Sequence, residues 1–136
     1  MNDVVLDASV VLKWLHFEGE RHLDAARALR AEFEAGELLV FAPPLLRLEL
    51  VNVAGRRWGW AESALVELAR ALQDLGFVFV EPELERVAIW TARGLTAYDA
   101  AYVAVAEDNA LRLITDDELM IDVAGGLATG LADTGG

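Results

Sequence analysis

The segment Val4-Val5-Leu6-Asp7-Ala8-Ser9-Val10 places an aspartate directly after a short apolar run. The apolar residues predict a buried strand, and a helix is expected to begin after Asp7. Near the other end of the chain, Leu113-Ile114-Thr115 predicts a second buried strand, and Asp117 follows it after one residue. We therefore expect both aspartates at the carboxyl ends of strands, although each of them is also a plausible helix cap.

Apolar runs alternate with helical patterns along the whole chain. Strands are predicted at residues 4–6, 38–41, 77–80 and 111–115, with an edge strand around 127–131. Helices are predicted at residues 20–35, from 43–44 to about 57, at 61–75, 82–93 and 97–109, and near 118. This alternation predicts one α/β domain over residues 1–136, with helices on both faces of a central, mostly parallel sheet and a weakly ordered tail at about 132–136.

Composition restricts the chemistry that the chain can perform. Cysteine is absent, which excludes disulfides, thiolate metal sites and thiol nucleophiles. The net charge of −12 argues against a broad basic face for nucleic acid, but it does not exclude a nucleic-acid substrate. The two histidines, His16 and His22, lie in or near a charged amphipathic stretch, so we expect ordinary surface residues with no role in a site.

The hydrophobic content is high for a soluble monomer. It amounts to 55% of residues, with a mean hydropathy of +0.33, which predicts apolar surface for a partner, either another copy or a second protein. No apolar run approaches the ~20 residues needed to span a bilayer, and the amino terminus does not resemble a signal peptide. We expect a cytoplasmic protein.

A glutamate stands on the apolar face of a predicted helix. Glu49 shares its helical stripe with Leu46 and Val53, positions that face inward. Asn52 lies on the same side and is suited to orient the carboxylate or a water molecule. The alternative is that the helix is rotated and Glu49 pairs with Arg47 or Arg56 at the rim.

A fourth acidic residue, Asp99, stands three residues after Thr96, which is a good helix N-cap. Asp99 also shares a helix face with Tyr102, so it is expected to point toward the core side, and the helix dipole favours an anion there. Capping and function are therefore compatible at this position.

The four carboxylates of Asp7, Glu49, Asp99 and Asp117 are expected to meet, because a parallel sheet binds its ligands at the carboxyl ends of its strands. Unpaired carboxylates in one place repel each other, and a divalent cation is the simplest group that would hold them together. Oxygen ligands alone favour Mg²⁺ or Mn²⁺ over zinc. The pattern predicts a metal-dependent enzyme.

Four ordered motifs resemble those of PIN-domain ribonucleases, and most closely the VapC-type toxins of prokaryotic toxin–antitoxin pairs. The similarity covers about residues 3 to 120. The motifs are Val5-Leu6-Asp7-Ala8-Ser9-Val10, Pro43-Pro44 leading to Glu49-Leu50-Val51-Asn52, Leu95-Thr96-Ala97-Tyr98-Asp99-Ala100, and Thr115-Asp116-Asp117.

This resemblance implies a three-layer α/β/α sandwich and endoribonuclease activity that depends on one or two Mg²⁺ or Mn²⁺ ions. It also implies a homodimer and a small VapB-like antitoxin. By position, Asp7, Asp99 and Asp117 are expected to hold the metal, and Glu49 holds it or positions the attacking water. Ser9, Asn52, Thr115 and Asp116 are expected around these ligands.

Two other functions are compatible with the same carboxylates. One is a PIN-like module that binds RNA or a protein with little or no cleavage. The other is a phosphoryl-receiver or phosphatase domain, which also places an aspartate after a strand. That chemistry usually needs a lysine after a later strand, whereas the only lysine here, Lys13, lies in the first helix.

Overall fold

The central sheet has five parallel strands in the order β3-β2-β1-β4-β5. The computed structural model describes residues 2–134. The strands are β1 (Asn2–Leu6), β2 (Leu38–Ala42), β3 (Val78–Phe79), β4 (Arg112–Thr115) and β5 (Ala128–Gly130). The predicted α/β class is confirmed, and the sheet is parallel throughout.

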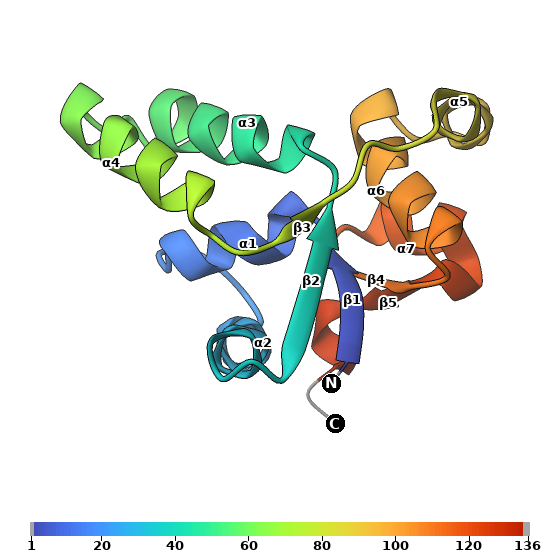
Figure 1. Ribbon diagram of the computed structural model, residues 1–136, viewed down its shortest axis with the longest axis horizontal. Helices are drawn as coiled ribbons and strands as arrows, with labels where there is room; N and C mark the ends of the chain where they lie inside the picture. The colour runs from blue at the N-terminus through green and yellow to red at the C-terminus, as the bar shows by residue number, and fades with distance from the viewer. Residues whose placement is uncertain (1, 135–136) are drawn as a thin grey trace.

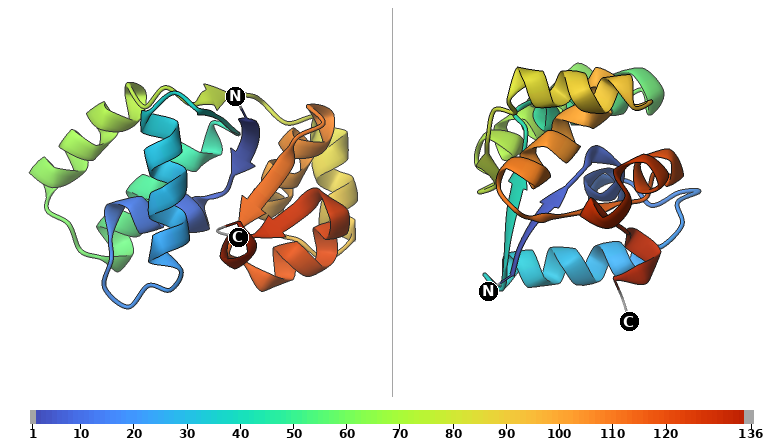
Figure 2. Two further views of the ribbon diagram at one scale, coloured as in Figure 1. Left: turned by 90° about the horizontal axis from the view of Figure 1, so that it is seen from below. Right: turned by 90° about the vertical axis from the view of Figure 1, so that its right-hand side faces the viewer.

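Helices cover both faces of the sheet. They are α1 (Ala8–Leu15), α2 (Leu23–Glu34), α3 (Leu45–Asn52), α4 (Glu62–Gln73), α5 (Leu84–Ala92), α6 (Ala97–Asp108) and α7 (Glu118–Ala124). In Figure 1, α1 to α4 lie to the left of the sheet and α5 to α7 lie to its right, and the left view of Figure 2, seen from below, shows the same separation. The three-layer α/β/α fold is therefore confirmed.

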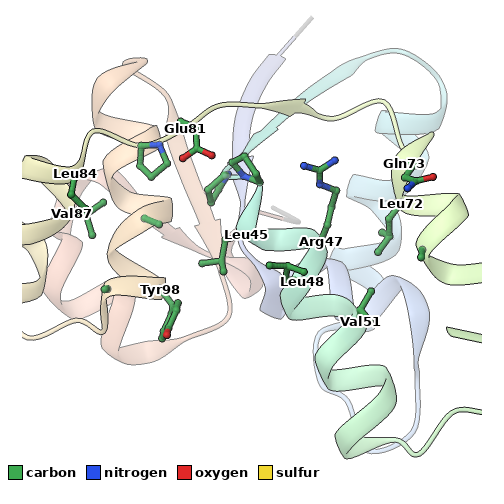
Figure 3. Close-up of a pocket in the computed structure, with 16 residues that line it drawn as sticks. Leu45, Arg47, Leu48, Val51, Leu72, Gln73, Glu81, Leu84, Val87 and Tyr98 are labelled. Atoms are coloured by element: carbon green, nitrogen blue, oxygen red, sulfur yellow. The ribbon is translucent and has the colours of Figure 1, made fainter. Parts of the chain in front are cut away.

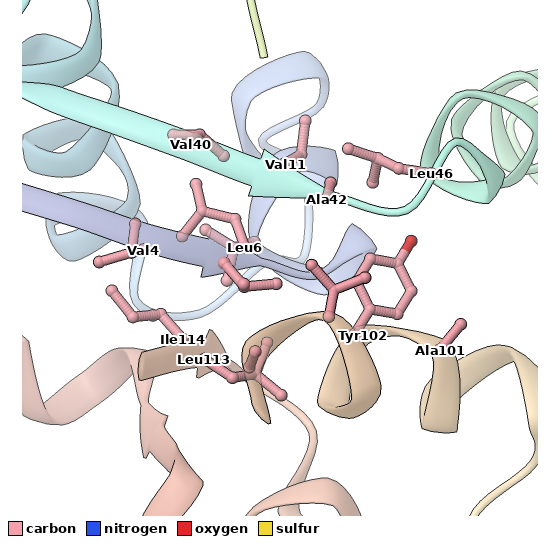
Figure 4. Close-up of a cluster of buried hydrophobic side chains, with 14 of the residues drawn as sticks. Val4, Leu6, Val11, Val40, Ala42, Leu46, Ala101, Tyr102, Leu113 and Ile114 are labelled. Atoms are coloured by element: carbon pink, nitrogen blue, oxygen red, sulfur yellow. The ribbon is translucent and has the colours of Figure 1, made fainter. Parts of the chain in front are cut away.

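The apolar runs of β1 and β4 form the centre of the core. Val5 and Leu6 of β1 and Leu113 of β4 are fully buried, and Leu6 pairs with Ile114 across the two strands. Figure 4 shows Leu6, Leu113 and Ile114 packed together in this core. Strands covered on both faces must be apolar throughout, which is why short runs without alternation predicted them correctly.

Helix α6 is the most deeply buried helix of the domain. Seven consecutive residues from Ala100 to Ala106 are buried, and four of the seven are alanine. The helix packs on β1, β2 and β4, while α5 packs against it from another side. Alanine side chains let the helix axis approach its neighbours closely, so α6 lies near the strand ends that carry the acidic residues.

Several element boundaries differ from the prediction. The helix expected from residue 20 begins at Leu23, because Gly19 and His22 have positive φ angles of 70° and 59° that interrupt a right-handed helix. The helix expected to run from 43–44 to about 57 is α-helical to Asn52 and continues as a π-helical turn, Val53–Arg57.

The carboxyl-terminal segment is better ordered than its composition suggests. A 3-10 turn (Gly125–Leu127) leads into β5, which joins the sheet beside β4, and a second 3-10 turn (Leu131–Asp133) follows. Of the tail predicted at about 132–136, residues 135 and 136 lie outside the described residues. Across residues 2–134, no helix has both the length and the apolar character to cross a membrane.

Candidate active site

The topology brings the ends of β1 and β4 together at a reversal of strand order. From β1 the chain proceeds to β2 and β3 on one side of the sheet, and it then crosses to β4 and β5 on the other side. Such a switch point leaves a crevice at the carboxyl ends of the two central strands. Asp7 directly follows β1, and Asp117 follows β4 after one residue.

The carboxylate of Asp7 is buried and accepts hydrogen bonds from two hydroxyl groups. The side chain of Ser9 donates a hydrogen bond to Oδ1 at 2.6 Å, and that of Thr115 donates one to Oδ2 at 2.7 Å. The residue is only 3% exposed. Although Asp7 occupies the N-cap position of α1, its side chain makes no capping hydrogen bond within the described part of the chain. The carboxylate is therefore oriented by hydroxyl groups and does not cap the helix.

Burial raises the pKa of Asp7 from its ordinary value of 3.8 to about 7. The hydroxyl groups of Ser9 and Thr115 lower this pKa, whereas the negative charges of Asp99 and Asp117 raise it further. Three of the four predicted carboxylates are thus close enough to repel one another.

Asp117 is both a helix cap and a neighbour of Asp7. Its Oδ1 accepts a hydrogen bond from the amide of Met120 at 3.1 Å, which caps α7. Its own amide donates to Thr115 Oγ1 at 3.0 Å. Since the same hydroxyl group donates to Asp7, Thr115 couples the positions of the two aspartates.

Asp116, the neighbour of Asp117, is turned to other partners. Its Oδ2 lies 3.1 Å from Nζ of Lys13, and its Oδ1 lies 3.0 Å from Nδ1 of His22. His22, expected as an ordinary surface residue, is partly exposed and makes this side-chain contact with Asp116. The contact joins residues 94 positions apart, and local sequence patterns carry no signal for such a pairing.

Glu49 points inward from α3 toward α6. The hydroxyl group of Tyr102 donates to its Oε1 at 2.5 Å, whereas the neighbouring Arg47 lies over the ring of Phe79 at 4.3 Å. The pKa of Glu49 is raised, chiefly by burial and also by the charge of Asp99. Within residues 2–134, no ion pair joins Glu49 to Arg47 or Arg56, so the rim-pairing alternative is not what the structure shows.

The contact between Tyr102 and Glu49 was not predicted from the sequence. Tyr102 is 1% exposed, and Figure 4 places its ring just beyond the carboxyl end of β1. The available signal was its position three residues after Asp99, on the same face of the helix.

Asp99 lies in the first turn of α6. Its amide donates to the Thr96 hydroxyl group at 3.1 Å, so the predicted cap is present. Its carboxylate is half-buried, and burial together with the charge of Asp117 raises its pKa. Since Asp99 also raises the pKa of Asp7 and Glu49, it is the central member of the acidic group.

An open cleft of about 650 Å³ gives access to half of this group. It is lined by Leu45, Leu48, Glu49, Val51, Asn52, Thr96, Tyr98 and Asp99. Asn52 thus lies on the same cleft as Glu49. A larger apolar groove of about 760 Å³ shares Leu45, Leu48, Val51 and Tyr98 with the cleft, and Figure 3 shows it running from α5 and α6 to α3 and α4.

The donor chemistry fits a hard divalent cation. Every side chain of the group is a carboxylate or a hydroxyl, and the mutual repulsion that raises the pKa values of Asp7 and Asp99 is what a cation would relieve. Among residues 2–134, however, no three acidic or histidine side chains are already close enough to enclose an ion. The carboxylates interact as neighbours, and binding would require them to draw closer.

Comparison with known proteins identifies the relatives of this arrangement. The model of the PIN domain family matches residues 4–126. Fourteen chains of solved structure also match, among them the crystal structure of PAE2754 from Pyrobaculum aerophilum. That structure has a TM-score of 0.67 and 26% sequence identity, over 96% of this chain and 92% of the other. No curated protein matches significantly.

A first prediction concerns the pH dependence of folding without metal. Asp7 releases its proton near pH 7 in the folded state but near its ordinary value of 3.8 when unfolded. Between these values the folded state binds more protons, so this group makes stability fall as the pH rises from about 4 to about 7. Urea unfolding in the presence of a chelator measures this slope.

The variant Asp7→Asn should lose that part of the pH dependence. Asp122→Asn, a change of an exposed carboxylate on α7, is the matched control and should keep the slope of the parent protein. An Asp7→Asn protein whose stability follows pH as the parent does would contradict the assigned ionisation.

A second prediction tests the contact between Tyr102 and Glu49. Tyr102→Phe removes the only hydroxyl group shown to bond this half-buried carboxylate, so the free energy of unfolding should fall by about 1–3 kcal/mol. Tyr98→Phe serves as control, because the Tyr98 side chain is 64% exposed, and it should change stability by less than about 0.5 kcal/mol. Equal stabilities of the two variants would argue against the contact.

Proposed function

Because this chain belongs to the PIN-domain family, we propose that it is a metal-dependent endoribonuclease and the toxin of a VapBC-type pair, acting in the cytoplasm. PIN domains are in general metal-dependent nucleases, so the family supplies the class of chemistry. The RNA substrate, the choice of Mg²⁺ or Mn²⁺ and the toxin role are the parts that we propose.

The observation that carries the proposal is the buried, doubly hydrogen-bonded Asp7 beside Asp99 and Asp117. A carboxylate of raised pKa has no structural advantage over an apolar side chain at the same place, because its burial costs free energy. Its retention is explained by a ligand that needs an anion. A function, and not folding, therefore accounts for the buried carboxylate of Asp7.

Each residue has a distinct task in the proposed reaction. Asp7, Asp99 and Asp117 would hold the divalent ion, and Ser9 and Thr115 keep Asp7 oriented toward it. When bound, a divalent ion of this kind activates water and neutralises negative charge at the scissile phosphate. Glu49 either joins the ligands or accepts a proton from the attacking water, and Tyr102 fixes its orientation.

The cleft beside Glu49 and Asp99 is the proposed path for the RNA backbone. Tyr98, an exposed aromatic ring next to Asp99, lines it and is suited to stack against a base. The net charge of −12 means that attraction of a phosphodiester depends on the bound cation and local arginines.

The two alternative functions, a receiver or phosphatase domain and an RNA-binding module, have less support. A receiver or phosphatase domain requires an available lysine, whereas Lys13 is buried in ion pairs with Glu20 and Asp116. A PIN-like module that binds RNA without cleavage differs from a nuclease only in activity, so a cleavage assay decides between the two.

The third prediction addresses the activity. Purified protein incubated with structured RNA should cleave it in the presence of Mn²⁺, and EDTA should abolish the cleavage. Asp99→Asn should reduce the rate about 100-fold, because it removes a proposed metal ligand whose charge raises the pKa of both Asp7 and Glu49, while the fold remains intact by circular dichroism.

The matched control is again Asp122→Asn, an acidic residue on the exposed side of α7. It should cleave RNA at the parental rate. If no RNA is cut in an EDTA-sensitive manner, the binding-module function replaces the nuclease.

The proposal includes a homodimer and a small VapB-like antitoxin. Support for a second copy comes from the apolar groove, whose border carries Leu48 and Leu84 with exposed fractions of 70% and 81%. Large apolar side chains gathered around one groove are typical of protein interfaces. The antitoxin follows from the resemblance to VapC-type toxins.

The fourth prediction tests the homodimer. The variant Leu48→Glu/Leu84→Glu places two charges on the border of the groove, and sedimentation velocity should show a monomer where the parent protein is a dimer. Leu119→Glu, at a leucine 53% exposed on α7, should leave the dimer intact. If the Leu48→Glu/Leu84→Glu variant sediments as the parent protein does, the groove is not the dimer interface.

A further inference from the structure

Two consecutive aspartates follow β4, and only one of them belongs to the acidic group. Asp117 repels Asp7 and Asp99, as the pKa values of both show. The carboxylate of Asp116 has each of its oxygens occupied, one by Lys13 at 3.1 Å and one by His22 at 3.0 Å. The turn after β4 therefore separates two carboxylates that are adjacent in sequence.

Lys13 is an unusual partner for the Asp116 carboxylate, because it is itself buried. It is the only lysine of the chain, and it is 3% exposed, on a face of α1 whose other buried residues are apolar. An unpaired buried ammonium group would cost several kcal/mol. Lys13 is compensated by Asp116 and by Glu20, whose Oε2 lies 3.4 Å from Nζ. An apolar residue would fill the same space without this compensation, so packing alone does not explain the lysine.

His22 reaches Asp116 from a backbone conformation that few residues adopt. It is a non-glycine residue with φ of 59°, a left-handed conformation that is unfavourable for residues with a Cβ atom. In this conformation it immediately precedes α2, with its ring on Asp116. Two separate segments, α1 and the loop before α2, thus converge on one carboxylate.

The backbone of Asp116 faces the site even though its side chain does not. Its amide donates to Ser9 Oγ at 2.9 Å, and Ser9 in turn donates to Asp7. Asp116 is therefore two hydrogen bonds away from the Asp7 carboxylate. Its side chain is held by Lys13 and His22, and we expect it to be able to rotate toward the ligand group once these partners are removed.

We propose that Lys13, assisted by His22, is a positioning residue that holds Asp116 away from the metal ligands and leaves Asp117 as the only carboxylate of this turn available to the ion. This inference rests on the proposed function, because it presupposes a divalent ion bound by Asp7, Asp99 and Asp117. It assigns a role to a lysine that touches neither metal nor substrate.

The test measures Mn²⁺ affinity of the full chain by calorimetry, without any RNA. Two isosteric variants are compared first. Asp117→Asn should weaken binding about 10-fold or more, because it removes a ligand, whereas Asp116→Asn should change affinity by less than about threefold. Both changes remove one negative charge, so a difference between them reports position and not charge.

The second comparison repeats Asp117→Asn in a Lys13→Met/His22→Ala background. With its partners removed, Asp116 is free to replace Asp117, and the loss caused by Asp117→Asn should shrink to less than about threefold. Adding Asp116→Asn to this background removes the substitute and should restore the loss of about 10-fold or more. A role confined to stability would lower the unfolding temperature but leave the effect of Asp117→Asn unchanged.

The outcomes separate this inference from the function on which it rests. If Asp117→Asn weakens Mn²⁺ binding equally in both backgrounds, or if Asp116→Asn weakens it as much as Asp117→Asn, the positioning role of Lys13 is overturned and the metal site stands. If the parent protein does not bind Mn²⁺, or if Asp117→Asn has no effect in it, the proposed metal site fails and the inference fails with it. If the Lys13 variant does not fold, equal effects of Asp116→Asn and Asp117→Asn would still overturn the inference.

Discussion

The burial of one carboxylate at the end of the central strand constrains the rest of the site. Asp7 follows β1, the central strand of the sheet, and is buried in the folded protein. A buried anion is tolerated only where donors surround it. Ser9 supplies one from the first turn of α1, and Thr115 supplies the other from the end of β4. The pairing of β1 with β4 is therefore also the step that completes the surroundings of Asp7.

The hydroxyl groups of Ser9 and Thr115 also fix the backbone of the turn after β4. Thr115 Oγ1 accepts a hydrogen bond from the amide of Asp117, and Ser9 Oγ accepts one from the amide of Asp116. The turn is thus attached to Asp7 by its backbone, which leaves the two carboxylates free to point in different directions. Glu49 is oriented separately, by Tyr102 from α6. The acidic group is assembled from four elements, and each member is fixed by a hydroxyl group or a backbone amide close to it.

The sequence predicted the parts of this structure that depend on local patterns. Fully apolar runs identified β1, β2 and β4, because a strand covered on both faces has no polar side. The inward direction of Glu49 followed from helical spacing, and the cap at Thr96 followed from its distance to Asp99. Local patterns did not reveal contacts between distant residues. The partners of Asp116 come from α1 and from a loop with a left-handed residue, and neither the positive φ of His22 nor the burial of Lys13 follows from the residue type.

The alanines of α6 have a consequence for how freely this protein can vary. Asp99 and Tyr102 are carried on the helix whose run of buried residues includes Ala100, Ala101, Ala104 and Ala106. Their small volume sets the distance between the helix and the strands, and with it the depth at which Asp99 and Tyr102 are held. A larger side chain at any of these positions would push the helix outward and carry both residues with it. Residues without a functional group of their own therefore limit which mutations the site can accept during evolution.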